Sequence, residues 1–201
     1  MAYPTVDAPY GLKPINLIGG QVFAGATRQI VIANTTGTGY NTNIFYGDVV
    51  KLASTGTIQV DAGTTTATPV GVFLGCQYIS AVTGQLTFSQ YYPASLAVKS
   101  GTTILAFVAD DPDQLFKVVL VAGTTADNTS SGLAPTFLGR TVIGSNAQLV
   151  QNAGSSVTGD SKVGIYTAAG ATTTATLPIH SADNHCTIHK DEGICTGATK
   201  E

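Results

Sequence analysis

Residues 69–92 read PVGVFLGCQYISAVTGQLTFSQYY, and this stretch decides the fold. Two runs rich in Val, Ile, Phe, Tyr and Thr, 69–79 and 85–92, flank the short segment 81–84, which ends in glycine. β-Branched and aromatic residues favour strands, and glycine adopts the positive φ that a tight turn requires. The stretch therefore predicts two antiparallel strands joined by a hairpin turn.

The same pattern extends along the chain in both directions. Ser54-Thr55-Gly56 predicts a second hairpin turn, and further short apolar runs predict strands at 29–33, 43–53, 57–62, 103–109, 115–122, 136–144 and 162–168. Apolar residues nowhere recur at helical spacing over the roughly ten residues that a helix needs. The sequence thus predicts an all-β chain, an antiparallel β-sandwich or barrel of jelly-roll type.

The two ends differ from this middle part in composition. Residues 1–28 carry three prolines and several glycines among isolated apolar residues, which is typical of an extended N-terminal arm. The β-rich domain is then expected to span 29–179. Residues 180–201 form a C-terminal tail of different composition, with all three histidines, two of the three cysteines and both glutamates of the chain.

The charge and hydropathy of the chain argue against several classes of partner. Charged residues make up 10% of the sequence, against about 25% in an ordinary globular protein, and the net charge is −3. The basic residues before the tail are scattered, so neither nucleic acid nor an anionic membrane is expected as a partner. The first residues show neither the basic nor the apolar region of a leader, which favours synthesis in a reducing cytoplasm.

The residue inventory also argues against catalysis in the body of the chain. Residues 1–179 contain no His, Glu or Trp and a single cysteine, Cys76. A Ser-His-Asp or Cys-His device would lack its base, and a carbohydrate-active sandwich would lack both stacking Trp and acid–base Glu. We therefore expect no enzyme, no cofactor and no small-molecule substrate, and we expect Cys76 to be a buried apolar residue.

Two clusters could in principle bind metal. Asp110, Asp111 and Asp113 offer carboxylates for Ca²⁺, but Asp111 before Pro112 is more typical of the N-cap of a short helical turn at 110–116. In the tail, the weak candidates for a zinc site are His185, Cys186, His189 and Cys195, with His180 as an alternative ligand. Their crowding in one short run differs from the paired spacing of zinc modules, so no metal is predicted.

The composition of the tail is compatible with two further interpretations. In the first, residues 180–201 lie against a neighbouring subunit. In the second, their abrupt change of composition reflects a shifted reading frame in the coding sequence. Resequencing the coding region across position 179 distinguishes the second from the first.

Several segments in order resemble the capsid decoration, or cement, proteins of tailed bacteriophages, of the kind found in phages of cyanobacteria and marine bacteria. The resemblance runs from about residue 10 to 179 and is carried by YGLKPINLIGGQVFAGATRQI (10–30), TNIFYGDVVKL (42–52), ATPVGVFLGCQY (67–78), TFSQYYPA (87–94) and FVADDPDQLF (107–116). It implies a structural virion protein on the head surface that binds the major capsid protein and staples neighbouring subunits. It also implies a homo-oligomer, a dimer or a trimer.

The apolar residues of the predicted arm are the candidates for this contact. An extended segment can lie across a partner and add backbone pairing at a sheet edge. We expect the capsid or intersubunit contact to involve Tyr10, Leu12, Ile15, Leu17, Ile18 and Phe23. An alternative function is a head-fibre or tail receptor-binding β-module, although such proteins usually carry repeats and this sequence shows none.

Overall fold

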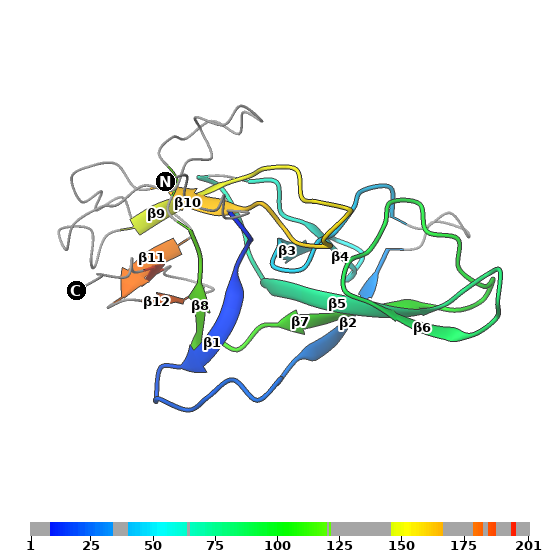
Figure 1. Cartoon of the computed structure of the whole chain (residues 1–201), viewed down its shortest axis with the longest axis horizontal. Helices are drawn as coiled ribbons and strands as arrows, with labels where there is room; N and C mark the ends of the chain where they lie inside the picture. The colour runs from blue at the N-terminus through cyan, green and yellow to red at the C-terminus, as the bar shows by residue number, and fades with distance from the viewer. Residues whose placement is uncertain are drawn as a thin grey trace, which may run out of the picture.

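The strands of this protein form two sheets (Figure 1). The computed structural model describes residues 9–33, 40–63, 65–119, 121 and 146–166, and the backbone of short strands at 179–182, 185–187 and 194–195. Within these residues every regular element is a strand, which confirms the all-β prediction. The pairing is mixed rather than purely antiparallel, because β2 and β4 run parallel.

The first sheet has six strands, in the order β3-β4-β2-β7-β5-β6. Their bounds are β2 (Arg28–Ile32), β3 (Val49–Leu52), β4 (Ile58–Val60), β5 (Gly71–Ile79), β6 (Leu86–Ser89) and β7 (Ile104–Ala109). The start of β5 also pairs with β3, so the pairings run in a circuit from β3 through β4, β2, β7 and β5 back to β3. β6 stands outside this circuit, bound to β5 alone among the described strands.

The second sheet has seven strands and lies on the left of Figure 1. Six of them follow the order β1-β8-β12-β11-β9-β10, and β13 pairs with β12. Their bounds are β1 (Lys13–Leu17), β8 (Gln114–Lys117), β9 (Asn146–Val150), β10 (Gly164–Tyr166), β11 (Ile179–Ala182), β12 (His185–Thr187) and β13 (Ile194–Cys195). The ends of the chain thus contribute strands to one sheet.

Two clusters of buried side chains hold the sheets together. One is made mainly of side chains from the six-stranded sheet, and its largest fully buried members include Phe73 and Tyr92. The other joins the two sheets, since it combines Val49 and Val72 of the first with Phe116 and Leu149 of the second. Burial of such side chains is the main stabilising contribution, about 1.5–3 kcal/mol for each.

Most of the predicted strands are present, although several are shorter than predicted. Both predicted hairpin turns are confirmed, with positive φ at Gly56 (77°) and Gly84 (69°). The run predicted at 43–53 forms a strand only at its end and otherwise makes single bridges at Ile44 and Tyr46. The strand predicted at 136–144 lies outside the described residues.

The helical turn predicted at 110–116 is wrong. Asp111 instead closes a tight turn, in which its Oδ1 accepts the N–H of Asp113 (2.9 Å) and its carbonyl accepts the N–H of Gln114 (3.1 Å). β8 begins at once, with the buried side chains of Gln114 and Phe116 alternating with the more accessible ones of Leu115 and Lys117. That alternation has the period of a strand, and pairing with β1 outweighs the local preference for a helix start.

Part of the predicted N-terminal arm belongs to the second sheet. Residues 1–8 lie outside the described residues, but Lys13–Leu17 pair with β8 as strand β1. The boundaries of the arm, the domain and the tail stay predictions. In the part of the chain that the structure describes, no helix has the length and apolar character needed to cross a membrane.

Candidate interaction surface

The described residues bring together no grouping of metal-binding side chains. No set of three or more His, Cys, Asp or Glu side chains lies close enough within them to hold an ion. Among the weak zinc candidates, His189 falls outside the described residues, and for the other three only the backbone is described. That backbone places Cys186 directly opposite Cys195 in the pair of β12 and β13.

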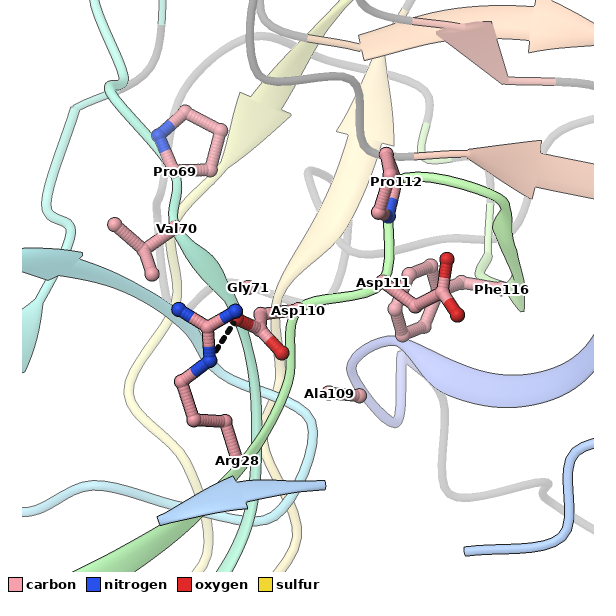
Figure 2. A pocket seen from close by; sticks show the side chains of 9 residues that line it. All are labelled: Arg28, Pro69, Val70, Gly71, Ala109, Asp110, Asp111, Pro112 and Phe116. Atoms are coloured by element: carbon pink, nitrogen blue, oxygen red, sulfur yellow. Dashed lines mark ion pairs between the residues drawn. The ribbon is translucent and has the colours of Figure 1, made fainter. Parts of the chain in front are cut away.

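Two aspartates of the 110–113 turn, Asp110 and Asp111, make contacts within the chain (Figure 2). Asp110 Oδ2 forms an ion pair of 2.8 Å with Arg28 Nε, and both residues line a cavity of about 260 Å³. The carboxylate of Asp111 closes the turn described above. Both contacts hold the loop between β7 and β8 in place, so these two aspartates have a structural role.

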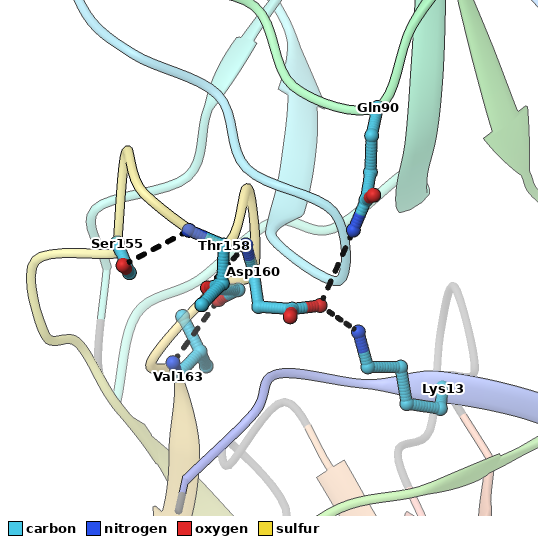
Figure 3. Close-up of polar contacts among 7 residues, drawn as sticks. Lys13, Gln90, Ser155, Thr158, Asp160 and Val163 are labelled. Carbon is cyan, nitrogen blue, oxygen red and sulfur yellow. Dashed lines mark hydrogen bonds and ion pairs between the residues drawn. The ribbon is translucent and has the colours of Figure 1, made fainter. Parts of the chain in front are cut away.

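A second polar network attaches β1 to the loop before β10 (Figure 3). Lys13 Nζ lies 2.6 Å from Asp160 Oδ1 and 3.9 Å from the ring centroid of Tyr46. Gln90 Nε2 also donates to Asp160 Oδ1, at 3.5 Å. A partly buried charge with these partners acts as a positioning contact between segments far apart in the sequence.

Asp48 is a buried carboxyl group beside this network. Its Oδ2 accepts the N–H of Phe45 at 2.7 Å, and the side chain of Ser161 hydrogen-bonds to the same carboxyl group. Burial disfavours the charged form and raises the pKa of Asp48 to about 6, although both hydrogen bonds act in the opposite direction. A cavity of about 390 Å³ adjoins it, lined also by Phe45 and Gln151.

The structure separates the predicted contact residues into two groups. Leu12 is fully buried and belongs to the cluster that joins the two sheets, so it is a core residue of this chain. Tyr10, Ile15, Leu17 and Phe23 are half-buried. Ile18 is 57% exposed and is the predicted contact residue with the most accessible side chain.

The outer side of β1 is covered by the chain itself. After a turn at 18–20, the N–H of Leu17 donates to Gln21 O (2.7 Å) and the N–H of Phe23 donates to Ile15 O (3.2 Å). The N–H of Leu17 and the carbonyl of Ile15 are therefore satisfied internally, so at these positions the region offers side chains and not backbone groups to a partner. Val22, which lies on the returning segment and bridges to Asn16, is 76% exposed, so this region offers a second accessible apolar side chain besides that of Ile18.

A second apolar surface lies on the hairpin of β5 and β6, at the right of Figure 1. Val82, Leu86 and Phe88 are 90%, 58% and 65% exposed. The ring of Phe88 stacks on that of Phe107 in β7, with centroids 6.3 Å apart. Charged side chains are absent from the whole run between Asp61 and Lys99, so this surface carries no charge of its own.

Sequence reasoning predicted this hairpin but missed its surface. The strand pattern of 69–92 was clear, whereas exposure of Leu86 and Phe88 depends on β6 lying at the end of a sheet. The absence of charge between Asp61 and Lys99 was the available signal. Exposed apolar surface is a common feature of contact sites in proteins, which makes the hairpin a candidate surface.

A scan of protein-family models and searches of the curated proteins and of the solved structures found no significant match to this chain.

Proposed function

We propose that this protein is a structural component of a phage head, a decoration protein that binds the outer capsid surface and staples neighbouring subunits of the major capsid protein. Several segments between residues 10 and 179 resemble, in the same order, those of capsid decoration proteins, and this resemblance supports the function. The fold class agrees with it, since proteins of this kind are small β-rich domains. The sandwich, barrel or jelly-roll arrangement within that class is part of the same proposal.

One observation of the structure carries the proposal further. Exposed apolar side chains occur in two regions, Ile18 and Val22 after β1 and the β5–β6 hairpin. β1 and β6 lie in different parts of the molecule (Figure 1). Burying an apolar side chain in a contact with another protein does not itself require a charge to be removed from water. A protein that staples two neighbours needs two such surfaces, and we assign the one around Ile18 to the capsid.

The proposal is tested by sedimenting the purified protein with decoration-free capsids of the phage that encodes it. We expect saturable pelleting at a fixed ratio to the capsid protein, because a lattice offers a fixed number of equivalent positions. Failure of the folded protein to pellet with these capsids would refute the function.

Two variants test the assigned surface. Ile18→Asp and Val22→Asp each place a charge in the proposed contact, so we expect the affinity for capsids to fall by about tenfold or more, equivalent to about 1.4 kcal/mol. Val157→Asp is the matched control, because Val157 is exposed in a different loop. Unchanged capsid binding by both variants would show that the contact does not involve this surface.

A further inference from the structure

β6 is an edge strand whose outer side has no partner strand among the described residues. It pairs with β5 on one side and ends the six-stranded sheet on the other. Edge strands present unpaired N–H and C=O groups, and proteins usually protect them with Lys, Pro, a bulge or a covering segment. The outer side of β1 has such a cover, whereas β6, with the sequence LTFS, carries neither charge nor proline.

The hydrogen-bond pattern of the hairpin shows which residues of β6 face outward. The N–H of Ser80 donates to Gln85 O at 3.0 Å. The carbonyl of Ile79, which lies opposite Leu86, accepts the N–H of Lys99 at 2.9 Å on the other side of β5. Hydrogen-bonded and non-hydrogen-bonded pairs alternate along an antiparallel ladder. The backbone groups of Leu86 and Phe88 therefore point away from β5.

The side chains of the same two residues are exposed. Leu86 and Phe88 lie on one face of the strand, since successive side chains alternate between faces. Leu105 and Phe107 of β7 are half-buried, and the ring of Phe107 stacks on that of Phe88, whereas Gln77 of β5 lies between Phe88 and Leu105. The edge thus combines outward backbone groups with an apolar face at the same two positions.

We propose that β6 pairs antiparallel with β6 of a second copy of this chain, about a two-fold axis at Thr87. In this register Leu86 of each copy lies opposite Phe88 of the other. The N–H and C=O groups of these residues then form four hydrogen bonds across the axis. The apolar faces of the two sheets become continuous.

A second copy fits this edge for reasons of symmetry and charge. A two-fold axis brings identical surfaces together, so any charge near the axis would face its own copy and repel it. The uncharged run between Asp61 and Lys99 removes this obstacle. The outward N–H and C=O groups belong to the residues directly before and after Thr87. A two-fold axis at Thr87 therefore places the donors of each copy opposite acceptors of the other.

The short length of β6 sets the expected strength. Four residues and two exposed apolar side chains in each copy correspond to an interface at the low end of known sizes, below about 1,200 Å². We therefore expect a reversible dimer with a dissociation constant in the micromolar range. The pairing is independent of capsid binding, and it is tested on the isolated protein.

Sedimentation equilibrium over a concentration series up to about 1 mM, which detects a binding free energy of about −4 kcal/mol, measures the dimer directly. We expect a monomer–dimer equilibrium in the full chain, and Phe88→Lys should weaken it by about tenfold or more. Val82→Lys is the matched control, because Val82 is exposed on the same hairpin but lies in its turn. A monomer at every concentration, or a dimer unaffected by Phe88→Lys, would overturn the proposal.

Disulfide trapping tests the register without relying on a destabilising change. In a Cys186→Ser, Cys195→Ser background, Thr87→Cys places its thiol opposite the same thiol of the other copy, about 4.5–5.5 Å away between Cα atoms. Oxidised glutathione, which accepts the two electrons, should then yield a covalent dimer. Thr83→Cys is the control, since the axis leaves its two copies roughly 20 Å apart or more. Equal cross-linking of both variants, or none of either, would exclude this register.

Discussion

Asp48 is a carboxylic acid held in the interior by two hydrogen bonds. Burial raises its pKa to about 6, whereas an aspartate in the unfolded chain has a pKa of about 3.9. Between these pH values the folded state binds the proton and the unfolded state does not. The free energy of unfolding therefore falls as the pH rises from about 4 to about 6. The stabilisation that the folded state gains by binding this proton is fully present only below about pH 4.

This residue gives a prediction that an isosteric variant isolates. At about 1.4 kcal/mol per pH unit, the wild type should lose about 2–3 kcal/mol of stability between about pH 4 and pH 7 relative to Asp48→Asn. Denaturant unfolding of both proteins across this pH range measures the difference. Parallel stability curves for the two proteins would show that Asp48 does not titrate in this range.

Gly154 is a position where lack of a side chain matters. A Cβ atom there would overlap the ring of Phe45, which itself stacks on Tyr91 with centroids 5.6 Å apart. Gly154→Ala should therefore destabilise the protein by about 1–3 kcal/mol, the usual cost of overpacking. Gly19→Ala is the control, because no atom lies within 4 Å of its added Cβ. Thermal unfolding compares them, and an equal midpoint for both variants would contradict the prediction.

At the scale of elements, Gln114 connects β8 to β1. Its side chain is buried, and Nε2 donates to Asn16 O (2.9 Å) and to Leu115 O (2.8 Å). The bond to Asn16 O crosses to β1 beside the register shift that lies between Pro14 and Asn16 in the pairing of the two strands. A buried carbonyl that loses such a donor costs about 1–3 kcal/mol.

Gln114→Leu should accordingly loosen one pair of strands. We expect faster amide hydrogen exchange over residues 13–17 and a loss of about 1–3 kcal/mol in unfolding free energy, with β5 affected less. Gln29→Leu serves as the comparison, since Gln29 is exposed. If both variants exchange alike over β1, the bonds of Gln114 contribute nothing particular to this pairing.

The elements also show how far the sequence predicts the fold. β4, β5, β6 and β7 were predictable because Val, Ile, Phe and Tyr gather in short runs between glycines. β1 was not, since Pro14 and nearby glycines favoured an arm, whereas its pairing with β8 depends on residues about a hundred positions later. The place of β11 and β12 between β8 and β9 is likewise a long-range arrangement that no local pattern predicts.

The candidate surfaces were predictable only in part. The apolar residues of 10–23 suggested a contact, but composition could not distinguish Leu12, which is buried among residues of both sheets, from Ile18, which is exposed. Exposure of Leu86 and Phe88 required knowing that β6 is the end of a sheet. Solvent exposure is a property of the assembled sheets and not of the local sequence.

On the scale of the whole molecule, the low charge has a consequence for association. The net charge is −3, and the hairpin surface contains no charged residue. Salt screens interactions between charges but leaves apolar burial intact. We expect the dimer affinity to change by less than about threefold between about 50 and 500 mM NaCl, measured by sedimentation, and a steep fall with salt would point to charged contacts instead.

Cys76 has a further use that follows from where it lies. Cys76 lies in β5, which is paired with β6 on one side and β7 on the other, and its side chain is buried in the core. Burial raises the pKa of its thiol to about 12, so at neutral pH the thiol is neither ionised nor accessible. Alkylating reagents attack thiolates, so they can reach Cys76 only when β5 separates from its neighbours. In a Cys186→Ser, Cys195→Ser background, the rate of alkylation of Cys76, compared with that of a free thiol, therefore measures how often the centre of the sheet opens.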